Sequence, residues 1–251
     1  GGKYGNRPGG AFTTASHPSS ENKLNMKQIL LSAFLILSFA YSKPDIDRIP
    51  VIVDTDANNE LDDQHALAYA FFNGEVFDIK GITVNATSGG GDADKQYEEG
   101  KRVMQLCNVW NRFPLKKGAN GNFDKISPRL GSDDYDGYEA VDFIIREALK
   151  MEERKLVLIP VGKLTNIALA IKKEPRIMEK IRIVWLGSNY PERGEYNLEN
   201  DIGALNYILD RQVPFEMVVV RYGTPYGSDV VRVTPAEIAE RMKNLGPKVM
   251  P

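Results

Sequence analysis

The fold prediction begins from one segment, Ile49-Pro50-Val51-Ile52-Val53-Asp54-Thr55-Asp56-Ala57-Asn58-Asn59-Glu60-Leu61-Asp62-Asp63. Its first half is a short apolar run, which is typical of a strand buried on both faces of a parallel sheet. Its second half places five carboxylates within ten residues, directly after the predicted strand. The segment therefore predicts a buried strand that delivers a polar, acidic loop to one edge of a sheet.

Downstream of this segment, short apolar runs alternate with longer amphipathic stretches, which is the pattern of βαβ units. We expect an α/β fold with an open, mostly parallel sheet and flanking helices. The predicted strands are Pro50–Asp54, Asp78–Val84, Leu115–Lys117, Lys155–Pro160, Ile181–Leu186 and Phe215–Val220. The predicted helices are Asp62–Phe72, Asp94–Val109, Tyr138–Met151, Thr165–Lys173, Asp201–Asp210 and Pro235–Asn244. Thr165 and Thr234 are predicted N-caps of the helices that they precede.

Polar segments follow four of the predicted strands. They are residues 54–63, 85–91, 161–166 and 187–197. In an open parallel sheet, ligands bind beyond the carboxyl ends of the strands, so these four segments should meet at one edge. We expect the binding site there.

The acidic loop is a candidate cation site because five neighbouring carboxylates repel one another unless a positive charge lies among them. Oxygen ligands favour Ca²⁺, whereas Mg²⁺ prefers to keep much of its water. Zinc is disfavoured, since the chain has only two histidines, His17 and His65. The alternative is a solvated loop in which Asp62 and Asp63 simply favour the start of a helix.

The chain resembles the nucleoside hydrolases in three segments, which occur in the family's order between about Ile49 and Leu245. The acidic loop is similar to the family's Asp-x-Asp-Pro-Gly-x-Asp-Asp fingerprint after the first strand. The second segment resembles Gly-x-Leu-Thr-Asn-Ile-Ala, and the third resembles Glu-Phe-Asn followed by Asp-Pro-Glu-Ala-Ala. In this chain they read Gly162-Lys163-Leu164-Thr165-Asn166-Ile167-Ala168 and Glu195-Tyr196-Asn197 with Asp201-Ile202-Gly203-Ala204.

The resemblance implies a calcium-dependent enzyme that hydrolyses the N-glycosidic bond of ribonucleosides. Asp56, Asp63 and the backbone carbonyl of Val161 are the implied calcium ligands. Asp56 is also the implied general base, and Asp54 is an implied supporting carboxylate that orients the ligands. The implied substrate-binding residues are Asp62 for the ribose 2′-hydroxyl, Asn85 as a further candidate, and Asn189, Glu195 and Asn197 for the other sugar hydroxyls. Tyr190, Tyr196 and Tyr222 are candidates for stacking on the base.

The sequence departs from the family pattern at three places. The acidic loop has five residues between Asp56 and Asp62 where the pattern has three, and it lacks Pro-Gly. Ser88 stands where the family usually places an asparagine, and Asn85 comes early. The resemblance also implies a later segment with a calcium-binding aspartate and a histidine, but the chain ends at Pro251. Either the sequence is a fragment of the native protein, which we expect, or the protein lacks these groups.

The N-terminal region predicts export rather than a folded domain. Residues 1–25 are rich in Gly, Ser, Asn and Thr and lack apolar periodicity, as in a disordered leader or upstream sequence. Residues 26–42 combine a basic start, an apolar run too short to cross a bilayer, and small residues, which is the pattern of a secretory signal peptide. Residues 45–251 are the predicted hydrolase-like domain. We expect a periplasmic or secreted protein without a stable membrane anchor.

The resemblance implies a small-molecule ribonucleoside as the partner, and composition indicates no other. The 32 Lys and Arg residues balance the 34 Asp and Glu residues, so nothing indicates nucleic-acid binding. One cysteine, Cys107, permits no internal disulfide. Two other functions remain open: a nucleoside- or sugar-binding protein without turnover, and a phosphohydrolase of the haloacid dehalogenase type. The resemblance allows a homodimer or a homotetramer.

Overall fold

The computed structural model describes residues 47–221 and 225–241. The predicted leader and signal peptide, Tyr222, and residues 242–244 of the last predicted helix lie outside these ranges.

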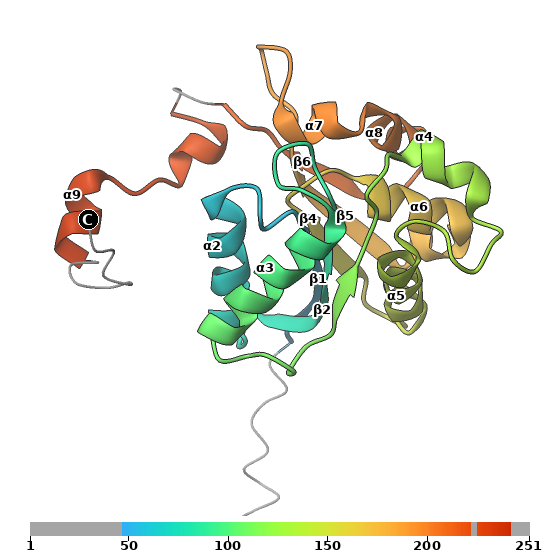
Figure 1. Ribbon diagram of the computed structural model, residues 1–251, viewed down its shortest axis with the longest axis horizontal. Helices are drawn as coiled ribbons and strands as arrows, with labels where there is room; N and C mark the ends of the chain where they lie inside the picture. The colour runs from blue at the N-terminus through green and yellow to red at the C-terminus, as the bar shows by residue number, and fades with distance from the viewer. Residues whose placement is uncertain (1–46, 222–224, 242–251) are drawn as a thin grey trace, which may run out of the picture. The chain divides into compact units, whose positions relative to one another are not determined.

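The described part of the chain folds around one parallel six-stranded sheet (Figure 1). Its order is β3-β2-β1-β4-β5-β6. From β1 the chain builds outward to β3 on one side, and it then crosses back to lay β4 on the other side of β1. The strands are β1 Ile49–Thr55, β2 Phe77–Val84, β3 Leu115–Lys117, β4 Leu156–Pro160, β5 Ile181–Leu186 and β6 Phe215–Val218.

Because the chain adds strands first on one side of β1 and then on the other, β1 and β4 lie side by side at the centre of the sheet. Their register pairs Asp54 with Pro160, so the two strands end at the same level. A crevice forms where the connections of neighbouring strands leave in opposite directions, and open α/β proteins bind ligands there. The acidic loop after β1 and the segment after β4 therefore meet at this crevice.

Helices cover both faces of the sheet (Figure 1). The longer helices are α2 Leu61–Phe72, α3 Ala93–Leu106, α5 Tyr138–Leu149, α6 Thr165–Lys173 and α8 Ile202–Leu209. The shorter elements are α4 Phe123–Ile126, α7 Tyr196–Asn200, α9 Pro235–Arg241, and the 3₁₀ helices η1 Ser127–Arg129, η2 Pro175–Glu179 and η3 Gly227–Val230.

Alternating side chains of β1 feed two separate apolar cores. Val51 and Val53 pack with α2 and α3 on one face. Ile52 packs on the other face, with α5, α6, α8 and the β5 residue Trp185. Because successive side chains of a strand point to opposite faces, a strand buried on both sides must be apolar throughout, as β1 is up to Val53.

The predicted fold class is confirmed. The ranges predicted for β3, β5 and α6 match those observed, and most other boundaries differ by one to three residues. The prediction missed α4, α7 and the 3₁₀ helices, which are too short to show a helical apolar period. The predicted cap at Thr165 is wrong: Leu164 is the N-cap of α6, and the Thr165 hydroxyl donates to Asp201 Oδ2 instead. Thr234 does cap α9, since its Oγ1 accepts from the Glu237 amide at 3.3 Å.

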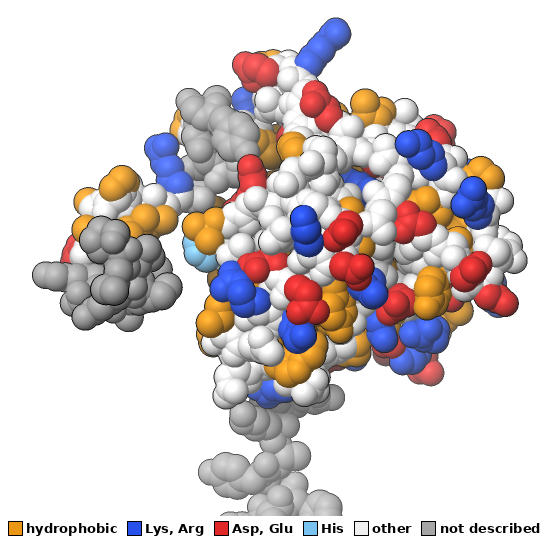
Figure 2. Space-filling view, viewed as in Figure 1, with side chains coloured by type: hydrophobic (Ala, Val, Ile, Leu, Met, Phe, Trp, Pro, Cys, Tyr) orange, Lys and Arg blue, Asp and Glu red, His pale blue; other side chains and the backbone are white. Residues whose placement is uncertain are grey.

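Acidic and basic side chains are interspersed with apolar ones over the face of the molecule in Figure 2. Within the described ranges, no helix is both long and apolar enough to cross a membrane.

Candidate functional site

Asp54, at the end of β1, organises a buried polar network behind the carboxyl edge. Its carboxylate accepts hydrogen bonds from Thr83 Oγ1 at 2.5 Å, Asn85 Nδ2 at 2.7 Å and Asn166 Nδ2 at 2.7 Å. Burial raises the Asp54 pKa to about 6, although the three donors act in the opposite direction. The network ties β1 to β2 and α6, and it supports the residues that follow β1.

Asp56 lies two residues beyond Asp54 and is also buried, with 1% of its surface exposed. Thr87 Oγ1 donates to its Oδ2 at 2.5 Å. Its Oδ1 is buried and has no hydrogen-bond partner among the described residues. Burial raises the Asp56 pKa to about 6, and the nearby Asp62 and Glu60 add to the rise. A buried carboxylate oxygen without a partner is costly unless a ligand completes it.

Asp63, in the first turn of α2, is the second buried carboxylate of the acidic loop. Its Oδ1 accepts from Thr55 Oγ1 at 3.0 Å. Burial and the neighbouring Asp56 charge raise the Asp63 pKa to about 8, the largest rise among the described carboxylates. The two side chains thus repel each other when both are ionised, and a cation between them would remove that repulsion.

These groups fit a hard divalent cation. Asp56 and Asp63 provide carboxylate oxygens, and the Asn85 Oδ1 is a second buried oxygen that has no partner within the described part of the chain. The Val161 carbonyl, at the end of β4, accepts from Asn197 Nδ2 at 2.7 Å and keeps a second lone pair. The described residues contain no cluster of three or more His, Cys, Asp or Glu side chains arranged for a metal. Asp56 and Asp63 provide the only two carboxylates in this set of groups, and the other oxygens are neutral; hard cations take oxygen ligands of both kinds.

Asp62 and Asn85, the two other predicted site residues in the segments after β1 and β2, differ in exposure. Asp62 is exposed and free to reach a ligand, whereas Asn85 is fully buried. The Asn85 amide nitrogen is used in the Asp54 network, so in this structure it serves the support of β1.

The three predicted sugar-binding residues after β5 make internal hydrogen bonds. Glu195 caps α7 by accepting from the Asn197 and Leu198 amides, and it also accepts from the Ser188 amide at 2.7 Å. Asn197 Nδ2 donates to the Val161 and Leu186 carbonyls at 2.7 and 3.0 Å. Asn189 Oδ1 accepts from the Tyr190 amide at 2.9 Å. The Glu195 and Asn197 contacts fasten α7 to the ends of β4 and β5, beside the acidic loop.

A cavity of about 540 Å³ lies beside the segment that follows β2. Thr87, the hydroxyl donor to Asp56, lies in its wall. Lys163 also lines it, with 2% of its surface exposed, and its Nζ donates to the Asn120 and Gly121 carbonyls at 3.1 and 2.7 Å. The lining residues are Ala86, Thr87, Ser88, Asn120, Asn122, Lys163, Tyr196, Glu199 and Asn200. Its size and polar lining suit a small polar ligand.

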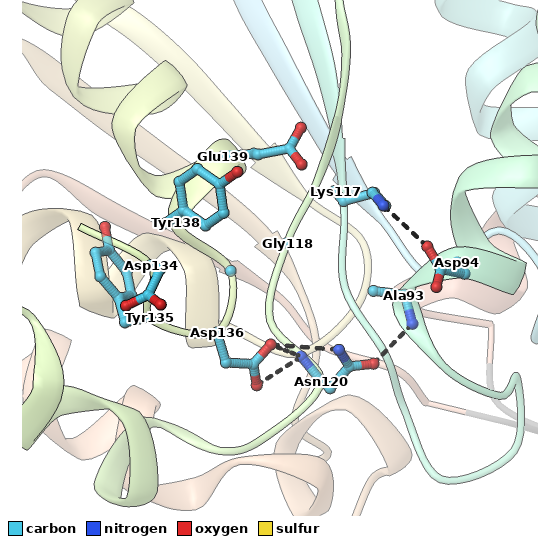
Figure 3. A pocket seen from close by; sticks show the side chains of 11 residues that line it. Ala93, Asp94, Lys117, Gly118, Asn120, Asp134, Tyr135, Asp136, Tyr138 and Glu139 are labelled. Atoms are coloured by element: carbon cyan, nitrogen blue, oxygen red, sulfur yellow. Dashed lines mark hydrogen bonds and ion pairs between the residues drawn. The ribbon is translucent and has the colours of Figure 1, made fainter. Parts of the chain in front are cut away.

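A second cavity, of about 250 Å³, lies between the starts of α3 and α5 (Figure 3). Asp136 accepts from the Asn120 and Gly121 amides, and Lys117 pairs with Asp94 at 3.1 Å. These contacts hold the loop after β3, and Asn120 belongs to both cavities.

Sequence reasoning missed the threonines that support the two carboxylates. Thr55 and Thr87 each place a hydroxyl on an aspartate, and Asn166 reaches Asp54 from a residue 112 positions away. Thr55 could have been noticed because it stands between Asp54 and Asp56. The partnership of Thr87 with Asp56 depends on the packing of two loops and leaves no sequence pattern.

Comparisons with known proteins identify the family of this chain. A sequence model described as inosine-uridine preferring nucleoside hydrolase matches residues 51–250. The non-specific ribonucleoside hydrolase RihC of Klebsiella pneumoniae is 30% identical over 176 residues, which cover 61% of this chain and 55% of that protein. The inosine-uridine preferring nucleoside hydrolase of Leishmania major is 25% identical over 223 residues, covering 79% of this chain and 67% of that protein. This chain thus spans little more than half the length of RihC.

A solved structure shares the fold. The inosine-uridine preferring nucleoside hydrolase of Bacillus anthracis superposes with a TM-score of 0.56 at 17% identity, over 77% of this chain and 70% of that one.

The fold and the site define an open, parallel α/β protein with buried carboxylates at the central crevice of the sheet. Within that class, the chain belongs to the inosine-uridine preferring nucleoside hydrolase family, whose sequence model matches from β1 to residue 250.

Proposed function

We propose that this protein hydrolyses the N-glycosidic bond of ribonucleosides to free base and ribose, in a calcium-dependent reaction. The observation that carries the proposal is the pair Asp56 and Asp63. Both are buried at the central crevice, both have raised pKa values, and Asp56 Oδ1 has no partner within the described ranges. Family membership and the ribonucleoside hydrolase activity named for RihC support the same reaction.

Each residue then has a defined task. Asp56, Asp63 and the Val161 carbonyl would hold the cation, which would lower the pKa of water and grip the vicinal diol of ribose. Asp56 takes the proton of the attacking water as general base. The buried carboxylates stabilise the positive charge that develops on the ribosyl group during cleavage. Asp62 receives the 2′-hydroxyl, so the proposal includes a strong preference for ribose over 2′-deoxyribose.

The test is ribose release from inosine and from uridine, in CaCl₂ and after removal of divalent cations with EDTA. We expect release that requires the cation and falls at least about 100-fold in kcat/KM for Asp56→Ala. Asp133→Asn, an exposed carboxylate on the loop before α5, is the matched control and should leave release unchanged. Calorimetric binding of inosine without ribose release would instead identify a binding protein. Phosphate release from p-nitrophenyl phosphate would identify a phosphohydrolase.

We also propose that the protein acts outside the cytoplasm. The support is the sequence pattern of residues 26–42 alone. Fractionation of cells that express the chain with and without these residues tests it: loss of export on their removal is expected, and export without them would contradict it.

A further inference from the structure

Two departures from the family pattern meet in the structure. The acidic loop is longer than the pattern because of residues such as Asn58 and Asn59, and Tyr196 stands where the pattern has phenylalanine. The Tyr196 hydroxyl donates to Asn59 Oδ1 at 3.3 Å. A phenylalanine could not make this bond, and a shorter loop would lack the residue that accepts it. The two departures therefore act as one structural unit.

The same hydroxyl holds the glycine loop, residues 87–91 after β2. It accepts from the Gly89 amide at 2.5 Å and from Ser88 Oγ at 3.2 Å. Asn200, at the other end of α7, accepts from the Ser88 amide at 2.8 Å. One side of α7 is thus bound to the glycine loop through both of its ends.

Asn58 makes a second connection between the acidic loop and the glycine loop. Its side-chain Nδ2 donates to the Gly90 carbonyl at 2.8 Å, and its backbone N–H donates to Gln96 Oε1 of α3 at 2.7 Å. The glycines permit this approach: a Cβ on Gly89 would lie 2.6 Å from Asn59 Oδ1, and one on Gly90 would lie 3.0 Å from the Asn59 nitrogen. Close contact between the two loops therefore accounts for Gly89 and Gly90.

We propose that the interloop clasp, formed by Asn58, Asn59, Ser88, Gly89, Gly90 and Tyr196, preforms the wall of the 540 Å³ cavity beside the proposed catalytic site and thereby promotes substrate binding, and that Tyr196 is its positioning residue. Ser88 and Tyr196 line that cavity directly. Thr87, which donates to Asp56 Oδ2, is the neighbour of Ser88, so the clasp also fixes the position of this donor. The proposal concerns substrate binding in the proposed function and rests on that function.

The expected effect is on binding more than on chemistry. Without the clasp, the glycine loop must be ordered when substrate binds, and the cost of that ordering reduces affinity. The Tyr196 hydroxyl takes part in three hydrogen bonds on an exposed surface, each of modest net value. We therefore expect its removal to raise KM on the order of tenfold.

The test is Tyr196→Phe in the whole chain, with inosine as substrate and with amide hydrogen exchange of residues 87–91. We expect KM to rise about tenfold while kcat changes less than about threefold, and the Gly89 amide to exchange at least about tenfold faster. Asn59→Ala should act in the same direction. The double variant should be less impaired than the sum of the two single effects, because both changes break one unit. Tyr69→Phe, which removes an exposed hydroxyl on α2, is the control and should change neither measurement.

Each other result overturns the proposal. Unchanged Gly89 exchange in Tyr196→Phe would mean that the hydroxyl does not order the loop. Faster exchange with an unchanged KM would mean that the clasp is structural only, and additive effects in the double variant would mean that the two residues act separately. If the parent chain releases no ribose, the proposed function fails, and the Kd for inosine from calorimetry replaces KM. In that case the clasp proposal requires that Tyr196→Phe raise both this Kd and the exchange rate of the Gly89 amide; a rise in only one of them would overturn it.

Discussion

Replacing Asp63 with asparagine should stabilise the metal-free protein. Some acids have a higher pKa in the folded state than in the unfolded state. Such an acid contributes its full stabilisation of the folded state only at pH values below its pKa in the unfolded state. This contribution to stability is lost as the pH rises through the pKa of the acid in the folded state. For Asp63 the window runs from its ordinary pKa of 3.8 to about 8. The metal-free parent should therefore become less stable between about pH 4 and pH 8, and asparagine, which never ionises, removes this loss.

The size of the effect follows from the shift. A pKa rise of about 4 units corresponds to a loss of at most about 6 kcal/mol of folding stability. Since pH 7 lies only about 3 units above the ordinary pKa, the loss at pH 7 is about 4 kcal/mol. Asp56 shares part of the repulsion, so we expect about 2–3 kcal/mol at pH 7. Asparagine can still accept from Thr55 through its carbonyl oxygen, so that hydrogen bond is kept.

Thermal unfolding followed by circular dichroism measures this effect. In EDTA at pH 7, Asp63→Asn should raise Tm by about 5–10 °C, and the gain should vanish near pH 4. Added CaCl₂ should raise the Tm of the parent but not that of the variant, because binding of the cation to the folded state is the source of stabilisation. Asp133→Asn, a change at an exposed position, should behave as the parent. A variant that melts below the parent in EDTA, or that gains as much from calcium, would refute the reasoning.

Three further changes test the site and its support. Gly118→Ala would place a Cβ 2.1 Å from the Val84 carbonyl, and it should cost about 3 kcal/mol in urea unfolding; an unchanged midpoint would contradict the packing described for the loop after β3. Trp185→Phe leaves the Gly162 carbonyl without its buried indole donor at 3.0 Å, so a loss of about 1–3 kcal/mol is expected in the same assay, and no loss would show that the bond contributes nothing. Asp62→Ala should reduce the preference for inosine over 2′-deoxyinosine by about tenfold, as the ratio of kcat/KM values, and an unchanged ratio would remove Asp62 from the sugar site.

The central strands could be predicted from sequence because each is a continuous apolar run with a polar segment directly behind it. The strand order follows less directly, since the sequence does not say that β4 returns to the far side of β1. The short helix α7 was missed because five residues show no helical apolar period, and the Glu195 carboxylate that caps its start leaves no further signal in the sequence.

The candidate site was predictable where the chain itself brings residues together. Asp54, Asp56 and Asp63 are close in sequence, and the structure keeps them at one end of β1 and the start of α2. The partners of these carboxylates come from other elements: Thr87 is 31 residues from Asp56, and Asn166 is 112 residues from Asp54. Such pairs depend on the packing of loops after different strands, and no local pattern encodes them.

The three donors to Asp54 have a consequence for how the sequence can evolve. Thr83, Asn85 and Asn166 all serve one buried carboxylate. Losing the acid would remove the acceptor of Thr83 and Asn85 and leave Asn166 only its bond to the Val84 carbonyl. Replacing one donor alone would leave the acid short of a partner. Across the relatives of this chain, these four positions should consequently be inherited as a block, and changes at them should co-vary even though position 166 is encoded far from the other three.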